Sequence, residues 1–511
     1  MYFSTVLFIL KWIGVLKMPN LFSLNYYKKR WFEVAVFLIL LLGFFLRFYN
    51  YEARFALAGD QTRDAIIAQY ALKEHKIPAT GPFSSAGNFT TGNIWYIWLI
   101  GTTSIYPASF LTPWIAMSAT YVLIVFLMIL IGKEIIDRKF GLILGLLAAA
   151  SPAQILQSSS LTNPSLVALF SALSIYFLVR YLKTAKNLFL FLFPFSIALA
   201  INTHFQAIYL LVLIPLTFIF KKPKLKGVFM AILGLVIPFI PYVLFDLENN
   251  RYNSRGIIDY LLYGQYKIYI PNRWLTYASV FFPQLWGKII GGTNIAGYFL
   301  IILSGISITY SIFKRKINKE MALLIVSFLA IFFALRFYRG ERFDGYFIFL
   351  HPLILILSAF ACYVVYKLNK IFGLSIIIVI LMLSLNANFE TLVRNKGYIN
   401  LQVNYWNRFL SEKYPGEKLE LYGHYSTSES LSLPLALVMY QSNHLADGGH
   451  KVGFSNTEQK YVGRFKVITG NEMGFEFWDL NSSSSAELKA SGWHSVNPSQ
   501  VYKTSAEWYK K

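Results

Sequence analysis

The sequence is poor in cysteine and in charge. A single cysteine, Cys362, occurs in 511 residues and lies within an apolar run, which excludes a disulfide framework and a thiolate metal site. Charged residues make up 14% of the chain, whereas ordinary soluble domains carry about 25%. The chain therefore lacks the polar surface that a soluble globular protein needs.

Long apolar runs are present instead. Hydrophobic residues make up 56% of the chain and aromatic residues 18%. They are grouped in blocks such as FLILLLGFFL and YVLIVFLMILIG, which are apolar on every side and therefore suit lipid or a bundle interior. The sequence predicts a polytopic α-helical protein of the plasma membrane, surrounded by membrane lipids.

Acidic residues are also scarce, with 25 Asp and Glu against 47 Lys and Arg, so the net charge is +22. The basic residues form short clusters between apolar blocks, which is typical of cytoplasmic loops and argues against a nucleic-acid partner. The clusters are Lys17 to Arg30; Lys133, Arg138 and Lys139; Arg180, Lys183 and Lys186; Lys221, Lys222, Lys224 and Lys226; Lys314, Arg315, Lys316 and Lys319; and Lys367 with Lys370.

These clusters constrain the path of the chain, because an even number of crossings must separate two clusters on one side. Residues 140–182 then divide into two helices at SSSLTNPS, and residues 187–220 divide at INTHFQ. Residues 93–106 remain as a helix that lies on or dips into the outer surface. We expect about eleven transmembrane helices, with the N-terminus inside and the C-terminus outside.

The chain divides into three parts. Residues 1–30 are expected to be a cytoplasmic or interfacial segment, either an interfacial helix or an extension upstream of the second methionine. Residues 31–387 form the transmembrane domain, with long outer loops at 50–110 and 248–294. Residues 388–511 lose the apolar blocks and predict a small extracytoplasmic α/β domain, in which KLELYGHY and YVGRFKVITG suit strands and SESLSLPLALVMYQ suits a helix.

Polar residues gather at the outer ends of the predicted helices, where they suit a cavity for an anionic headgroup on a lipid tail. The planar fork of arginine makes bidentate bonds to phosphate, and a nearby carboxylate could act as general base for a hydroxyl. The candidate residues of this cavity are Asp60, Arg63, Asp64, Asn88, Asn163, His204, Asp246, Glu248, Arg339, Arg342 and His351.

The stretch GDQTRDA, directly after the first span, carries two of the carboxylates. A helix that begins near Gln61 places Asp60 and Asp64 on one face. Asp60 could be a catalytic base or only the N-cap of this helix. For Asp64, an ion pair with Arg63 is the favoured interpretation over a catalytic role.

Other candidates also have structural alternatives. His204 could be a simple hydrogen-bonding residue at a helix turn. Arg339 and Arg342 could be interfacial anchors that extend to the headgroup level. His351 lies within a predicted span, where a polar side chain is costly unless it has a function.

The first loop resembles that of the GT-C superfamily of lipid-linked glycosyltransferases. The resemblance rests on GDQTRDA and GPFSSAGNFTTGNIWYIW, and it extends to SPAQILQSSSLTNPSL, THFQAIYLL and PYVLFDLENN. It covers roughly residues 30–390. It is stronger to the bacterial branch related to protein O-mannosyltransferases and to the aminoarabinose transferase of lipid A.

The resemblance implies a glycosyltransferase that moves a sugar from a polyprenyl-phosphate donor to an acceptor lipid, glycan or protein on the extracytoplasmic face, with inversion of the anomeric centre. Asp60 matches the position of the acidic catalytic residue in the family, and Asp64 follows it. Arg339 and Arg342, with Arg63, are the candidates for binding the donor phosphate. Related enzymes often carry a second acidic residue where this chain has Asn163, so a divalent metal is possible but not assigned.

Two other classes of function remain as alternatives. A transporter or flippase of lipid-linked saccharides predicts charged residues at the membrane midplane and paired broken helices, and neither feature is found in the sequence. A membrane anchor for the C-terminal domain does not need eleven spans.

Overall fold

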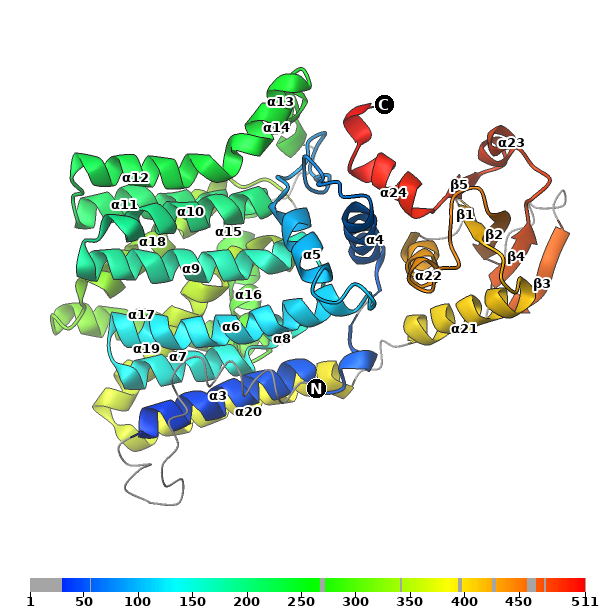
Figure 1. The fold of residues 1–511 in the computed structure, drawn as a ribbon. Helices are drawn as coiled ribbons and strands as arrows, with labels where there is room; N and C mark the ends of the chain where they lie inside the picture. Colours follow the sequence, from blue (N-terminus) through cyan, green and yellow to red (C-terminus); the bar gives the residue numbers. More distant parts are fainter. Residues whose placement is uncertain are drawn as a thin grey trace.

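The structure, a computed structural model, describes residues 30–55, 57–266, 272–340, 342–393, 398–424, 429–456, 466–472 and 475–510. Residues 1–29, which we predict to form the cytoplasmic or interfacial segment, lie outside these ranges. The described chain forms a bundle of helices joined to a small α/β unit that contains all of its named strands (Figure 1).

The bundle is built from long apolar helices that run roughly alongside one another (Figure 1). These are α3 (Trp31–Phe48), α6 (Thr112–Ile135), α7 (Arg138–Ala150), α8 (Pro152–Ser158), α9 (Asn163–Thr184), α10 (Asn187–Thr203), η2 (Phe205–Val212), α11 (Leu213–Phe220), α12 (Leu225–Val236), η3 (Ile237–Phe239), α13 (Ile240–Glu248), α17 (Asn294–Phe313), α18 (Lys319–Ala334), α19 (His351–Leu368) and α20 (Lys370–Val393).

Shorter elements gather at one end of the bundle. They are η1 (Tyr51–Ala53), α4 (Gly59–Lys73), α5 (Ile94–Thr103), α14 (Tyr252–Leu262), η4 (Gly264–Tyr266), α15 (Arg273–Thr276), η5 (Tyr277–Phe281), α16 (Phe282–Ile289), η6 (Leu335–Phe337) and η7 (Asp344–Leu350). We call this end, where α3, α8, α10 and α13 terminate, the loop end. The opposite end, where α9 turns into α10 and α17 into α18, carries the lysine and arginine clusters and is called the basic end.

Eight helical stretches of the described chain are long and apolar enough to cross a membrane, or nine if α7 and α8 form one span bent by 57°. The shorter apolar helices α10 and η2–α11 lie where we predict two further spans. Both predicted divisions are present, because α8 ends at Ser158 before α9 begins, and α10 ends at Thr203 before η2. The number eleven stays a prediction.

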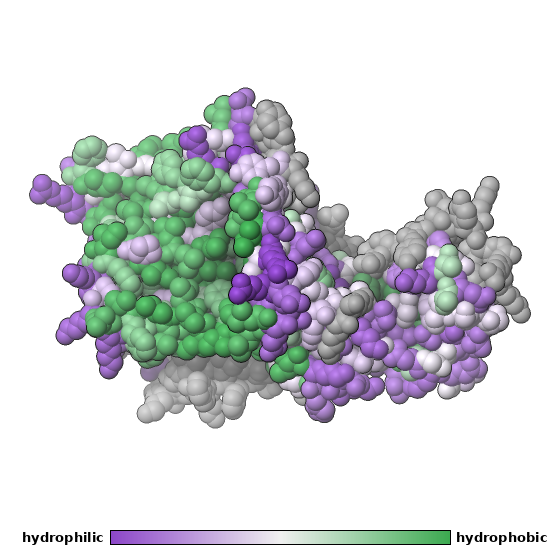
Figure 2. All heavy atoms as spheres, turned by 90° about the horizontal axis from the view of Figure 1, so that it is seen from above, coloured by the Kyte–Doolittle hydropathy of each residue, from purple (hydrophilic) through white to green (hydrophobic). Residues whose placement is uncertain are grey.

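The surface of the bundle is that of a multi-pass membrane protein. A broad apolar face lies between polar residues at the two ends of the helices (Figure 2). Large apolar side chains on this surface are highly exposed, including Leu225 at 86%, Phe313 at 81% and Ile371 at 80%. Since helices satisfy their own backbone hydrogen bonds, such surfaces are stable in lipid.

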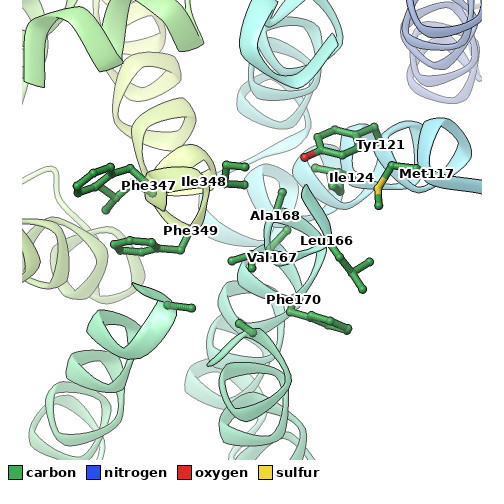
Figure 3. Close-up of a cluster of buried hydrophobic side chains, with 14 of the residues drawn as sticks. Met117, Tyr121, Ile124, Leu166, Val167, Ala168, Phe170, Phe347, Ile348 and Phe349 are labelled. Atoms are coloured by element: carbon green, nitrogen blue, oxygen red, sulfur yellow. The ribbon is translucent and has the colours of Figure 1, made fainter. Parts of the chain in front are cut away.

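The interior of the bundle is packed from α6, α9 and η7 (Figure 3). Met117 and Tyr121 of α6, Val167 of α9 and Phe349 of η7 are all buried and belong to one hydrophobic cluster. Hydroxyl groups tie these elements together, since Tyr121 donates to the carbonyl of Ser165 at 2.8 Å. This packing holds η7, which follows the arginine candidates in the chain, against the centre of the bundle.

The bend between α7 and α8 has a local cause. Pro152 has no N–H, so it cannot bond to the carbonyl oxygen of Ala148, and the helix breaks. The guanidinium of Arg47, from α3, donates to the carbonyls of Ala148 at 3.2 Å and Ala149 at 3.0 Å. Arg47 is completely buried. It therefore supplies the donors that the broken helix lacks.

The α/β unit contains α21 (Tyr398–Lys413), β1 (Leu419–His424), α22 (Glu429–Gln441), β2 (His450–Asn456), β3 (Lys466–Glu472), β4 (Phe475–Asp479), α23 (Ser485–Ala490), β5 (Trp493–Ser495), α24 (Pro498–Ser505) and η8 (Trp508–Lys510). The sheet has the order β3-β4-β2-β1-β5. The parallel pair β1 and β2 is connected through α22. The predictions of strands around 418–425 and 461–470 and of a helix near 428–441 are confirmed for their described residues.

The α/β unit rests on the loop end, on helix α4. Gln69 of α4 donates to Gln441 of α22 at 2.9 Å, and Tyr70 packs on Tyr502 of α24 with ring centroids 5.1 Å apart. After α24, the ring of Trp508 lies 5.3 Å from that of Phe83 in the first loop. The C-terminal part of the chain therefore covers α4 and the loop beside it.

Replacing Arg47 by Met tests the capping of the bend. The substitution keeps much of the side-chain length but leaves two buried carbonyl groups without a donor, at a cost of about 1–3 kcal/mol each. We expect a clearly lower midpoint of thermal unfolding in detergent. The matched control is Arg255→Met on α14, an exposed arginine, which should change the midpoint little. Equal midpoints for the two variants would contradict the capping role.

Candidate active site

Helix α4 begins after the chain leaves α3 through the short η1 turn. Its N-cap is Ala58, which makes no side-chain cap, and Asp60 lies in the first turn. The alternative that Asp60 is the N-cap is therefore wrong. A carboxylate in the first turn is still favourable, because the N-terminus of a helix carries partial positive charge.

The two carboxylates of α4 lie on one face, as predicted, and both bind Arg63. Nη1 of Arg63 donates to Oδ1 of Asp60 at 2.6 Å, and its Nε donates to Oδ1 of Asp64 at 2.9 Å. Their surroundings differ greatly, since the side chain of Asp60 is 77% exposed and that of Asp64 is 3% exposed. Asp60 is thus accessible to a ligand, whereas Asp64 is enclosed.

Asp64 is enclosed by helix α5. Its Oδ2 accepts from Nε1 of Trp95 at 2.8 Å, and its Oδ1 accepts from the hydroxyl of Tyr96 at 3.1 Å. Burial raises the pKa of Asp64, although the charge of Arg63 and the bond from Trp95 act in the opposite direction. Burial lowers the pKa of Arg63. The interactions with Asp64, Tyr96 and Asp60 outweigh this effect and raise the pKa of Arg63 above its ordinary value. The ion pair that we favoured for Asp64 is present in this form.

Turns that are distant in the sequence meet α4 and α5 at the loop end. Gln61 of α4 donates to the hydroxyl of Ser160, in the turn before α9, at 3.2 Å. The side chain of Asn163 then donates to the carbonyl of Thr203, at the end of α10, at 3.0 Å. Asn163 therefore joins two turns of the loop end.

The same region reaches the segment before α19. The ring of His204 stacks on that of Tyr346 in η7, with centroids 5.3 Å apart. The hydroxyl of Tyr346 is 2.8 Å from that of Ser85 in the first loop. Three separate segments of the chain therefore converge around these side chains.

Three arginines form a cluster beside this region, and we call Arg273, Arg339 and Arg342 the arginine cluster. Arg342 donates to the carbonyl of Arg273 at 2.8 Å and to the hydroxyl of Thr276 at 2.9 Å. The guanidinium of Arg339 lies 4.3 Å from the centre of the Tyr266 ring. Arg339 and Arg342, from the segment before η7, are thus brought together with an arginine of the second long loop.

Arg273 is the member that the sequence analysis missed. Its Nη2 is buried and has no hydrogen-bond partner among the described residues. Burial lowers the pKa of Arg273, and repulsion from Arg342 and Arg339 lowers it further. Clustered cations with a donor left over are suited to binding an anion. The only sequence signal was an arginine within a long outer loop.

Asp246 and Glu248 differ in role although they are two residues apart. Oδ1 of Asp246 accepts from the backbone N–H of Asn253 at 2.7 Å, and its Oδ2 accepts from the hydroxyl of Ser254. Both oxygens thus cap the start of α14, a role that the sequence did not indicate. Glu248 is exposed and lines a surface hollow of about 280 Å³ that also includes Asn93.

Asn88 and His351 are the two candidates that remain. Asn88 is exposed in the first loop. His351 is 2% exposed at the start of α19, and its Nδ1 has no described partner. Among the described residues, no three His, Cys, Asp or Glu side chains are grouped in a way that could hold a metal ion.

Comparison with solved structures identifies the fold. ArnT from Cupriavidus metallidurans in the apo state aligns with a TM-score of 0.61 and 10% sequence identity over 88% of this chain and 98% of that chain. The fold is that of the GT-C membrane glycosyltransferases. ArnT bound to undecaprenyl phosphate aligns with a TM-score of 0.60 and 11% identity over 88% of this chain and 97% of that chain.

This fold agrees with the resemblance drawn from the first loop, which is confirmed at the level of the fold. An archaeal oligosaccharyltransferase from Archaeoglobus fulgidus also aligns, with a TM-score of 0.49 and 13% identity over 81% of this chain and 64% of that chain. No family model matches the sequence, and no curated protein sequence matches it.

Two substitutions on α4 separate the buried carboxylate from the exposed one. Asp64→Ala leaves the Trp95 and Tyr96 donors and Arg63 without their buried acceptor, so we expect a loss of about 3–5 kcal/mol. Asp60→Ala removes an exposed ion-pair partner, for which about 0–1 kcal/mol is expected. Thermal unfolding in detergent, followed by tryptophan fluorescence, compares them. A loss of stability as large for Asp60→Ala as for Asp64→Ala would refute this assignment.

Proposed function

We propose that this protein is a membrane glycosyltransferase that uses a polyprenyl-phosphate-linked sugar as donor. The fold supports this proposal, because the similar ArnT was solved with undecaprenyl phosphate. The observation that carries it is the exposed Asp60, held by Arg63 at the loop end of the bundle. An accessible carboxylate at the water-facing end of membrane helices suits proton transfer at a lipid headgroup.

Asp60 is proposed as the catalytic base. Its Oδ1 accepts from Arg63, and its Oδ2 has no hydrogen-bond partner among the described residues, so Oδ2 can take the proton of an acceptor hydroxyl. The hydroxyl oxygen then forms a bond to the anomeric carbon of the sugar. The bond from that carbon to the phosphate oxygen breaks, and polyprenyl phosphate leaves with the electron pair. Attack from the face opposite the phosphate inverts the anomeric centre.

Arg63 and Asp64 are proposed to position this base. Arg63 donates to both carboxylates, so it is engaged in the protein and is a weaker candidate for the donor phosphate than we inferred from the sequence. Asp64 holds the guanidinium of Arg63 in place. Because Asp64 is buried, its charge attracts that of Arg63 strongly. A base whose partner is fixed in this way needs little reorganisation during the reaction.

The donor phosphate is proposed to bind at the arginine cluster. Arg339 is exposed, and the free Nη2 of Arg273 adds a donor. Bidentate arginine–phosphate bonds are among the stronger hydrogen bonds in proteins. We propose that His204, which stacks on Tyr346, lines the path between this cluster and the first loop.

The reaction is proposed to occur on the extracytoplasmic face. The lysine and arginine clusters predict that the basic end faces the cytoplasm, and α4 and the arginine cluster lie at the loop end. The acceptor is a lipid, a glycan or a protein that carries a free hydroxyl, and the α/β unit above α4 borders its approach.

Asp60→Asn tests the catalytic role. The amide accepts no proton at neutral pH, so we expect sugar transfer from a polyprenyl-phosphate donor to fall by about 10²-fold or more, while the unfolding midpoint changes little. Transfer is measured in membranes with a labelled donor. Undiminished transfer would discard Asp60 as the base.

A transport assay with the wild-type protein distinguishes a transporter from a transferase. In sealed vesicles, a carrier would move the lipid-linked saccharide across the bilayer without forming a new glycosidic bond. Saccharide efflux without bond formation in the wild-type protein would contradict the proposed transferase.

Arg273→Gln tests the phosphate site. Loss of one charged hydrogen bond costs about 1.5–3 kcal/mol, so we expect the KM for the donor to rise by about tenfold or more, with a smaller change in kcat. Arg255→Gln is the control, since Arg255 is an exposed arginine of the same long loop. An equal KM for the two variants would exclude Arg273 from the donor site.

A further inference from the structure

A second pocket lies at the basic end of the bundle, far from α4 along the helices. It is a cavity of about 140 Å³ between the end of α17, the start of α18 and the end of α19. For comparison, an engineered apolar cavity of roughly 150 Å³ admits a benzene ring. Its lining includes Lys316, Met321, Phe360, Val364, Lys367 and Leu368.

The walls of this pocket are divided by polarity. Met321, Phe360 and Val364 give it an apolar side, and Phe360 and Met321 are buried in the bundle. Lys316 and Lys367 give it a cationic side. A pocket with one apolar and one cationic side matches a molecule with an anionic head and an apolar chain.

The two lysines are available to a ligand. Lys316 is exposed and makes no ion pair among the described residues. Nζ of Lys367 lies 3.9 Å from Asp137, which is a loose contact, and 5.2 Å from the centre of the Tyr363 ring. Both ammonium groups can therefore turn toward an anion at the mouth of the pocket.

Both carboxylate oxygens of Asp137, the acidic residue next to Lys367, already accept hydrogen bonds. One of its oxygens accepts from the backbone N–H of Phe140 at 2.8 Å and caps α7, and the other accepts from the hydroxyl of Tyr363. These bonds keep the carboxylate at the edge of the site. Glu134, which pairs with Arg180 and Lys183, and Glu320 are the other acidic residues in the segments around the pocket. These segments carry more basic than acidic residues, among them Lys133, Arg138, Lys139, Lys316, Lys319 and Lys367.

The pocket opens where the helix ends meet the lipid-facing surface. Leu368, which lines it, is 59% exposed, and Ile312 and Phe313 at the end of α17 are 58% and 81% exposed. Such apolar side chains face acyl chains in a membrane. A ligand can thus enter the pocket sideways from the bilayer without passing through water.

We propose that this pocket binds the headgroup of an anionic glycerophospholipid. The phosphate lies against Lys316 and Lys367, and the first part of an acyl chain follows Phe360 and Leu368. A free inorganic anion would leave the apolar side unused. The site is independent of the proposed transfer reaction and gives one of the basic clusters a function in addition to orientation.

Lipid titration of the purified protein in detergent tests this site. Phosphatidylglycerol and phosphatidylcholine are added separately, and binding is followed by native mass spectrometry and by the unfolding midpoint. We expect preferential binding of phosphatidylglycerol. Each lysine near an anionic headgroup is worth about a fivefold change in affinity, so Lys316→Gln is expected to weaken binding about fivefold and the double variant with Lys367→Gln roughly 25-fold.

The control is the double variant Lys222→Gln with Lys224→Gln, in the loop between α11 and α12 at the same end. It removes equal charge outside the pocket and should keep the preference for phosphatidylglycerol. Equal loss in the two double variants would indicate a diffuse surface charge and overturn the site. Equal stabilisation by inorganic phosphate or by phosphatidylcholine would overturn it as well.

Discussion

The buried carboxylate of Asp64 is the interaction on which the arrangement of the loop end depends. It receives hydrogen bonds from Trp95, Tyr96 and Arg63, and each of these donors lies in α4 or α5. A buried charge is stable only when such partners surround it. These bonds therefore fix helix α4 against α5. They also fix the place of the accessible Asp60, which lies one turn earlier in α4.

The structure separates a rigid apolar scaffold from a polar end that is assembled from many turns. The helices meet through apolar packing and a few hydroxyl bonds such as that from Tyr121 to Ser165. At the loop end, in contrast, Gln61, Asn163 and Tyr346 connect turns that are 40 to several hundred residues apart in the chain. Placing the polar groups on the ends of fixed helices limits their motion, which suits a site that must hold a charged headgroup.

Much of the fold could be predicted because lipid imposes strong patterns on the sequence. Apolar blocks indicated the spans, basic clusters indicated the turns at one end, and alternating residues indicated the strands of the α/β unit. The motif GDQTRDA also indicated a helix with two carboxylates on one face. Short helices such as α10 were harder to classify, because length and composition do not separate a thin span from a helix buried in the bundle.

The site could be predicted only in part, because burial depends on residues that are distant in the chain. The sequence does not reveal that Asp64 lies under Trp95, or that Ala58 rather than Asp60 precedes the helix. Nor does it reveal that Arg342, 69 residues later, donates to the backbone carbonyl of Arg273 and so brings the two arginines together. Asp246 was selected for its charge, and its capping of α14 follows from a turn whose geometry the sequence does not specify.

The arginine at the end of the first span has a consequence for biogenesis. Arg47 is surrounded by backbone carbonyl groups of another span, and in an isolated α3 it would face acyl chains or be drawn toward the headgroups. The helix pair at Pro152 has the complementary defect, since its freed carbonyls lack donors until the pair packs against α3. Neither span is complete alone in the bilayer, so the two must associate early, as a unit, when the nascent chain leaves the insertion machinery.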